Sequence, residues 1–338
     1  MTNRIHENLT YLADEECVRL VDRFFIITGH FYMASGKRNR KRSLWHPSYW
    51  PAWTLVCLLW LLSFLPMGLK QRLGGWLGRL LSRKMQSRAR VADANLAACM
   101  PELDAASRGQ LVEDAFVASA RGVLESVHAW WRDMTPYCES ASVHGTEHLE
   151  EAKRRGKGVL LIGGHYSIFD FALPLIACKL EKPGYMYRPN NNPVIDRMIE
   201  RGRRRHFGIR SFTKRQIRPM LSFLKEGGQV WFACDQDFGK KSEVFVPFFG
   251  VSAGCITSPS YIARESGAAV ICVSHLRMPD GSYRVVFSPI QESFGEYPEQ
   301  DAEVWNRFIE TTVREQPDQY LWLHKRFKSR PEGAAAIY

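Results

Sequence analysis

The chain has 338 residues, enough for one large domain or two modest ones, and its formal net charge is +11. This charge favours anionic partners, namely nucleic acid, anionic lipid or an acidic protein. Ten Trp residues and 45% hydrophobic residues exclude a disordered basic tail. The eight Cys residues form no C-x-x-C pair, so they indicate neither a zinc site nor a disulfide framework and favour a reducing compartment. We expect no cleavable signal peptide.

Residues 1–44 form a basic leader that ends in a cluster of five cations between Lys37 and Arg42. Such a cluster can be a solvated charge run or a nucleic-acid contact. The next segment, 45–69, lies in a stretch from Ser43 to Leu69 that has no Asp, Glu, Lys or Arg. It carries several Trp residues and is followed by more cations. An apolar helix with aromatic ends and basic flanks is typical of a membrane anchor, although a buried soluble helix is the alternative.

The anchor is short for a full span. Residues 51–66 would make a helix of ~24 Å, whereas the hydrocarbon core is ~30 Å thick. Cations lie on both sides of the segment, so they give no clear orientation. We therefore expect residues 45–69 to anchor the chain to a membrane, and we favour full spanning only weakly.

The remaining residues, 70–338, are expected to form one catalytic domain. Apolar residues at helical spacing predict helices at 88–96, 109–132 and 144–155. After residue 158 strands and helices alternate. Strands are expected at 159–162, 185–188, 209–212, 229–234, 269–274 and 283–288, and helices at 194–206, 215–226, 258–265, 302–315 and 317–327. This order predicts an α/β fold whose central sheet is mixed, mostly parallel and flanked by helices.

The stretch 158–171 carries the main chemical signal. A buried strand runs into Gly163 and Gly164, and His165 follows at once. Ser167 is expected to cap the next helix, with Asp170 three residues later as in a capping box. A His held by a carboxylate is a general base for an alcohol, so His165 and Asp170 are the candidate catalytic pair. The alternative is a structural His beside a carboxylate that only caps the helix.

Two further predicted strands end in polar residues. Arg188 and Asn191 follow one strand, and Asp235, Gln236 and Asp237 follow another. If these strands are parallel to the first, all of these residues meet at one sheet edge, where α/β folds place ligands. Arg188 suits a phosphate or carboxylate. The two Asp residues could brace Arg188, belong to a turn or, least favoured, bind a metal. The chain has no P-loop, no G-x-G-x-x-G after a strand and no G-x-S-x-G elbow.

These blocks occur in an order that resembles the late acyltransferases of lipid A biosynthesis, in the lysophospholipid acyltransferase superfamily. The resemblance covers the chain from about Trp45 onward, and Asp170 stands where many members have Glu. It rests on His165-x4-Asp170 and on the segments 46–50, 95–102, 187–192, 230–239, 246–250 and 319–331.

The resemblance implies a glycerolipid acyltransferase-like fold and an acyl transfer without cofactor or metal. The donor would be acyl-acyl carrier protein, and the acceptor would be a hydroxyl of a hydroxyacyl chain on Kdo2-lipid IVA or its mono-acylated product. His165 would be the base and Asp170 would orient it, while Arg188, Asn191, Asp235, Gln236 and Asp237 would line the substrate site. The enzyme would work on the cytoplasmic face of the bacterial inner membrane and bind no nucleic acid. An acyltransferase for another glycolipid or a lysophospholipid is the alternative, and a basic binding protein is a third possibility.

Overall fold

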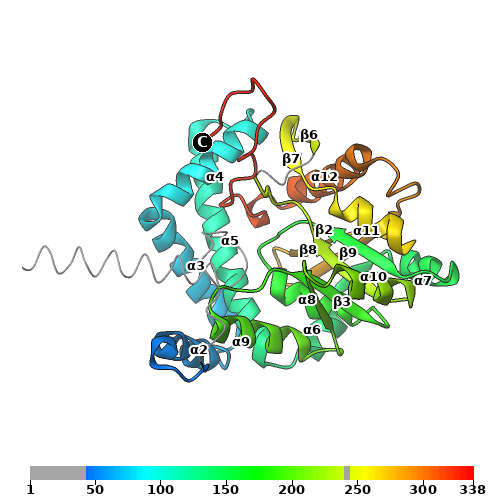
Figure 1. Cartoon of the computed structure of the whole chain (residues 1–338). Helices are drawn as coiled ribbons and strands as arrows, with labels where there is room; N and C mark the ends of the chain where they lie inside the picture. Colours follow the sequence, from blue (N-terminus) through cyan, green and yellow to red (C-terminus); the bar gives the residue numbers. More distant parts are fainter. Residues whose placement is uncertain (1–42, 240–243) are drawn as a thin grey trace, which may run out of the picture.

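The computed structural model describes residues 43–239 and 244–338, so the basic cluster at 37–42 lies outside the described residues. Helices α2 to α5 lie on one side of the molecule, and the sheet with its flanking helices lies on the other (Figure 1). The first part consists of a 3-10 helix η1 (Pro47–Tyr49), α2 (Trp50–Leu62), α3 (Met67–Lys84), α4 (Gln86–Cys99), α5 (Ala105–Trp131) and α6 (Thr135–Ser140). The second consists of β1 (Ser142–His144), α7 (Thr146–Arg154), β2 (Val159–Gly163), α8 (Phe169–Ala177), β3 (Pro183–Tyr187), α9 (Pro193–Arg204), β4 (Arg210–Thr213), α10 (Ile217–Lys225), β5 (Gln229–Ala233), β6 (Val244–Phe248), β7 (Val251–Cys255), α11 (Ser258–Ser266), β8 (Ala269–Arg277), β9 (Tyr283–Ile290), α12 (Pro298–Glu315) and the 3-10 helix η2 (Pro317–Gln319).

The seven-stranded sheet has the order β1-β9-β8-β2-β5-β3-β4. Strands β8, β2, β5, β3 and β4 form a run in which each strand is parallel to the next. Strand β9, on the other side of β8, pairs with β8 antiparallel. This confirms the predicted mixed, mostly parallel sheet with its antiparallel part late in the chain. Strands β6 and β7 form a separate antiparallel hairpin.

The central strand β2 is buried on both faces, as its continuous apolar sequence predicts. Leu160 and Ile162 pack in a core with Trp305 of α12. Val159 and Leu161 pack in a second core with residues of α8 such as Phe171. Because successive side chains of a strand point to opposite faces, the same five residues bind both helical layers to the sheet.

The helical part is joined to the sheet through a buried carboxylate on α5. Glu125 accepts hydrogen bonds from Gln71 of α3 at 2.6 Å, Arg277 of β8 at 2.6 Å and Tyr283 of β9 at 2.8 Å. Gly122, one turn earlier, lies so close to the loop after β2 that an added Cβ would be 1.8 Å from the carbonyl oxygen of Ser167. The long helix thus fixes the position of that loop.

The predicted anchor segment, 45–69, contains a shorter helix than its apolar length suggests. Helix α2 stops at Leu62, and Pro66 precedes the start of α3. Across residues 43–239 and 244–338, no helix combines the length and the apolar character that crossing a bilayer requires.

Most other predicted elements are found with bounds shifted by a few residues, and one is wrong. Residues 317–327 do not continue as a helix: only η2 is helical there, and the chain then extends along the loop after β2. The sequence analysis also missed β1, β6 and β7.

Candidate active site

The loop after β2 places His165 at the sheet edge, as predicted. Gly163 and Gly164 leave no room for side chains there, because a Cβ on Gly163 would be 2.5 Å from the carbonyl oxygen of Val273. The C-terminal segment holds the loop from the other side: the Leu321 amide donates to the His165 carbonyl at 3.2 Å, and Tyr166 and Tyr320 form a β-bridge.

The carboxylate that holds His165 is Asp235. Its Oδ1 lies 2.5 Å from His165 Nδ1, and its Oδ2 accepts a hydrogen bond from the His165 amide at 2.9 Å. Asp235 comes directly after β5, which pairs in parallel with β2, so the two strand ends lie side by side. The predicted meeting of these strand ends is therefore confirmed for His165 and Asp235.

The predicted pairing of His165 with Asp170 is wrong. Asp170 is buried in the first turn of α8, and its Oδ1 accepts a hydrogen bond from Nε of the buried Arg203 on α9. The predicted capping box is absent as well, because α8 begins at Phe169 with Ile168 as its N-cap. A buried carboxylate needs a charge partner, and Arg203 supplies one that His165, already held by Asp235, does not.

The ring of Phe169 links the two pairs. It stacks on the His165 ring, with centroids 5.1 Å apart and planes at 8°, and on Trp231 at 4.5 Å. The guanidinium carbon of Arg203 lies 5.8 Å from the centroid of the same ring. Arg203 and Phe169 were not singled out from the sequence, since Arg203 is one of several cations in a basic helix.

The environment of Asp235 keeps it ionised. Burial alone raises the pKa of Asp235, but the charge of His165 and the two hydrogen bonds that His165 donates outweigh burial and lower the pKa to about 2. An ionised Asp235 accepts a hydrogen bond from Nδ1–H, so the imidazole is the tautomer whose Nε2 lone pair is free. The His165 side chain is 16% exposed, and within the described residues its Nε2 has no hydrogen-bond partner. This is the arrangement of a general base.

On the side of the protein interior, uncharged aromatic rings lie near His165. The ring of the fully buried His275 lies edge-on to Trp231 at 5.1 Å and to Tyr166 at 5.0 Å. Burial and, to a smaller extent, the nearby His165 together lower the pKa of His275 to about 3, so His275 is neutral.

The other predicted site residues have different surroundings. Arg188 and Asn191 are exposed after β3, which neighbours β5, and Gln236 is half-buried. Asp237 is buried and accepts hydrogen bonds from the Gly239 amide at 2.7 Å and the Ser329 hydroxyl at 2.9 Å, so it holds the C-terminal segment. In the described residues no group of three His, Cys, Asp or Glu side chains could hold a metal ion.

A His base on a carboxylate at the edge of an α/β sheet, without a nucleophile beside it, defines a class of enzymes that activate a substrate hydroxyl. Comparison with known proteins identifies the class further, because residues 37–329 match the model of the bacterial lipid A biosynthesis acyltransferases. The chain is 35% identical over 303 residues to the lipid A biosynthesis lauroyltransferase of Escherichia coli, covering 88% of this chain and 97% of the relative. It is 31% identical over 306 residues to the palmitoleoyltransferase of the same organism, with the same coverages. It is also 25% identical over 301 residues to the E. coli myristoyltransferase, covering 88% of this chain and 93% of the relative. The chain belongs to the bacterial lipid A biosynthesis acyltransferase family, and it is an O-acyltransferase.

Proposed function

We propose that this enzyme transfers a fatty acyl chain from acyl-acyl carrier protein to a hydroxyl of a hydroxyacyl chain on Kdo2-lipid IVA or its mono-acylated product. The observation that carries this proposal is the His165–Asp235 pair with its open Nε2, together with membership of the family.

The reaction needs one base and no enzyme nucleophile. His165 Nε2 takes the proton of the acceptor hydroxyl, whose oxygen attacks the carbonyl carbon of the thioester. The carbon–sulfur bond then breaks, and the carrier thiolate receives the proton from the imidazolium. The negative charge of Asp235 stabilises the imidazolium and keeps Nδ1 protonated. Asp170 acts as a positioning residue: through Arg203 it holds the first turn of α8, whose Phe169 packs on His165.

The polar residues beyond the base suit an anionic acceptor. Arg188 and Asn191 follow β3 at the same sheet edge, so they are placed to bind phosphate or carboxylate groups of the acceptor, with Gln236 beside them after β5. The net charge of +11 also suits the acidic carrier protein.

We place the enzyme on the cytoplasmic face of the inner membrane, where the carrier protein is found. Supporting this, the first helices expose a set of large apolar side chains, a surface that soluble monomers rarely carry. They are Trp45, Trp50, Leu58, Trp60, Leu61, Phe64, Leu69, Trp76 and Leu80. Fractionation of cells that produce the full chain should recover it with inner-membrane vesicles. Replacing Trp60 and Leu61 by Ser should release part of it to the soluble fraction.

The purified protein tests the reaction directly. Labelled acyl-acyl carrier protein and Kdo2-lipid IVA should give a lipid whose mass has increased by one acyl group. His165→Ala should lower kcat by about 10²- to 10⁴-fold, because general-base catalysis is lost, while the circular dichroism spectrum of the variant stays that of the folded enzyme. Normal turnover by that variant would exclude this mechanism, and preferential acylation of a lysophospholipid would exclude this acceptor.

A further inference from the structure

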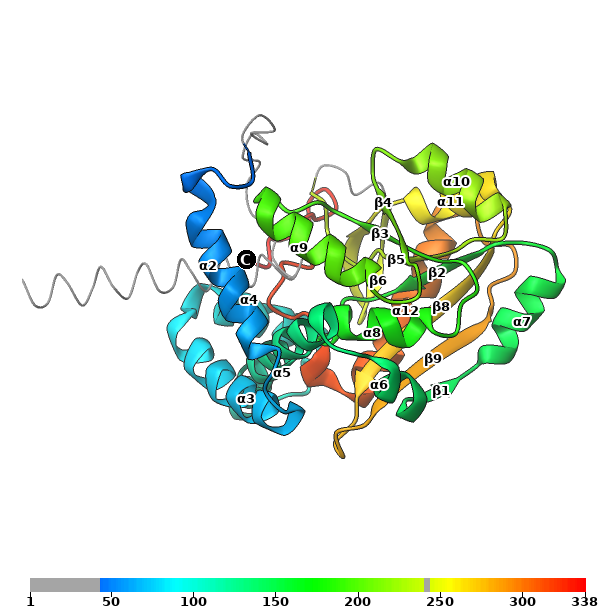
Figure 2. The ribbon, with the colours of Figure 1, turned by 90° about the horizontal axis from the view of Figure 1, so that it is seen from below.

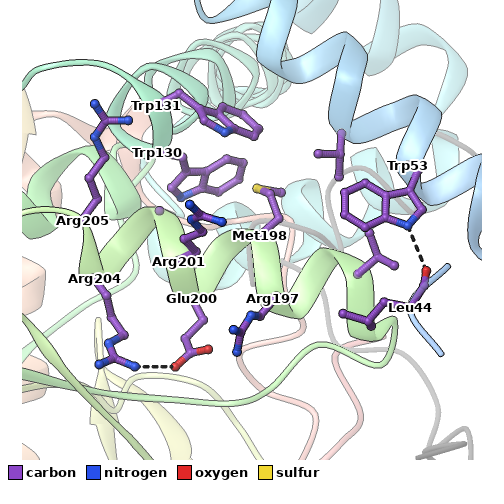
Figure 3. Close-up of a pocket in the computed structure, with 13 residues that line it drawn as sticks. Leu44, Trp53, Trp130, Trp131, Arg197, Met198, Glu200, Arg201, Arg204 and Arg205 are labelled. Atoms are coloured by element: carbon purple, nitrogen blue, oxygen red, sulfur yellow. Dashed lines mark hydrogen bonds and ion pairs between the residues drawn. The ribbon is translucent and has the colours of Figure 1, made fainter. Parts of the chain in front are cut away.

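A second cavity lies outside the catalytic pair, between α2, α9 and the C-terminal end of α5. Its volume is about 750 Å³, within the ~300–1,000 Å³ that is usual for ligand sites. Figure 3 shows Met198 of α9 between the Trp130–Trp131 pair on one side and Trp53 on the other, with Arg201 next to Trp130. The lining consists of Leu44, Trp53, Val56, Trp130, Trp131, Val194, Arg197, Met198, Glu200, Arg201, Gly202, Arg204 and Arg205.

The charged residues of this cavity come from α9. Arg197, Arg201 and Arg205 are spaced by four residues, are exposed, and have no ion-pair partner among the described residues. Arg204 is paired with Glu200, the one acidic residue in the lining, at 3.3 Å. Four guanidinium groups and one carboxylate leave the lining with a net charge of +3, so it is built to accept several negative charges.

The remaining wall is apolar and includes a buried donor, the indole N–H of Trp130. Trp130 is 2% exposed, and within the described residues its indole N–H has no hydrogen-bond partner. The buried side chains below it, including Leu59 of α2 and Ile199 of α9, form a small core that fixes the two helices on α5. A buried donor beside free arginines indicates a ligand with several acceptor oxygens and an apolar part.

The same helix carries Arg203, the cation of the buried pair with Asp170 of α8. Arg203 lies one residue from Gly202 of the cavity, yet it faces inward to Asp170 and the ring of Phe169. On the opposite side of the cavity, α2 exposes Leu58, Trp60 and Leu61. Helix α9 thus lies between α2, which exposes these apolar side chains, and the sheet whose strand β2 leads to the catalytic base (Figure 2).

We propose that this cavity binds the headgroup of the acceptor lipid, through at least two phosphate groups on that headgroup. The inference rests on the proposed function and deepens it. A singly charged phospholipid would neutralise only one of three excess charges, and a concave cavity of this size suits a headgroup better than the surface of a carrier protein.

The test measures binding separately from turnover. Full-length enzyme carrying His165→Ala is titrated with mixed micelles that contain a disaccharide lipid with two phosphate groups. Arg197→Gln with Arg201→Gln should weaken binding by about 10- to 100-fold, because two charge-assisted contacts are lost. The matched control, Arg154→Gln with Arg307→Gln, removes two cations that are 74% and 78% exposed on α7 and α12, and its affinity should stay within twofold.

The charge and the shape of the site are tested by two more arms. Val56→Trp fills the apolar wall without changing charge and should also weaken binding, which covers the case in which the arginine variant folds poorly. Micelles of phosphatidylglycerol and free inorganic pyrophosphate should bind at least tenfold more weakly than the diphosphorylated lipid.

Three outcomes would overturn the inference. They are equal losses in the arginine variant and its control, equal affinity for phosphatidylglycerol, and a loss that affects binding of the acidic carrier protein but not of the lipid. The diphosphorylated lipid could bind as expected while the wild-type enzyme transfers no acyl group. In that case the proposed function fails, but the assignment of this cavity as a headgroup site stands.

Discussion

Two buried carboxylates flank the strand end that carries the active site, one paired with an imidazole and the other with a guanidinium, and the two pairs differ in what they leave open. In the pair of His165 and Asp235 the imidazole side chain is 16% exposed and one ring nitrogen is free. In the pair of Arg203 and Asp170 the two side chains are 7% and 0% exposed. The ring of Phe169 lies against both the imidazole of His165 and the guanidinium of Arg203.

The difference shows how similar charges can serve chemistry in one place and position in another. A guanidinium stays protonated at all ordinary pH values, so Arg203 can neutralise a buried carboxylate but cannot accept a proton. An imidazole changes charge near neutral pH, so it can act as a base when one nitrogen faces the substrate. The residue that can exchange a proton, His165, and the residue that carries a fixed charge, Arg203, thus lie on the same aromatic ring, that of Phe169.

The largest effect is expected on the activity, when the pair of His165 and Asp235 is changed. Asp235→Asn should lower kcat by about 10³- to 10⁴-fold, because the amide N–H₂ turned toward Nδ1 favours the tautomer whose Nε2 carries the proton. The free energy of unfolding should change far less than the activity. Single-turnover rates with acyl-acyl carrier protein would measure the effect.

A double variant decides whether the two residues act as one unit. Adding Asp235→Asn to His165→Ala should cost little beyond His165→Ala alone, since the carboxylate works through the imidazole. A further 10³-fold loss in the double variant would mean that Asp235 has a separate task.

The next largest effect is expected on stability, when the buried pair of Arg203 and Asp170 is broken. Arg203→Met leaves the Asp170 carboxylate buried without a cation, so the free energy of unfolding should fall by about 3–5 kcal/mol. The neighbouring Arg204→Met is the matched control: Arg204 is 59% exposed in its pair with Glu200, so the change should be within about 0.5 kcal/mol. Urea unfolding in detergent would measure both, and equal losses would contradict the assignment of Arg203 as the buried partner.

The smallest effect is the acid dependence of the open pair. The pKa of Asp235 is lowered to about 2 in the folded protein from an ordinary 3.8, so its contribution to stability is complete above about pH 4 and declines as pH falls toward 2. Between pH 5 and pH 3 the wild type should lose roughly 1 kcal/mol more than Asp235→Asn, in which this group no longer titrates. Parallel curves for the two proteins would show that His165 does not stabilise the ionised form.

Much of the sheet edge that carries His165 could be predicted from the sequence, because the patterns that mark the ends of its strands are local. A β-branched run, two glycines and a His mark the end of β2, and a similar apolar run marks β5 before Asp235. The partner of His165 was not predictable in the same way, because it depends on which strands are neighbours. Asp170 is five residues from His165 and looked suitable, whereas Asp235 is 70 residues away and comes near only because β5 pairs with β2.

Residues 320–323 explain the one helix that was predicted wrongly. They are all buried, so their apolar spacing resembled a helix face. Their backbone instead pairs with the loop after β2 through Tyr166 and Tyr320, a long-range contact that no local pattern indicates.

That contact also sets an order of events during biosynthesis. The loop that carries His165 is held in place by the Leu321 amide and the Tyr320 bridge, residues made about 155 positions later. The sheet strands β2 and β5 can pair on the ribosome before those residues exist, because domains fold as their parts emerge. The loop that carries His165, however, is held in place only after residues 319–321, which contact it, have been made.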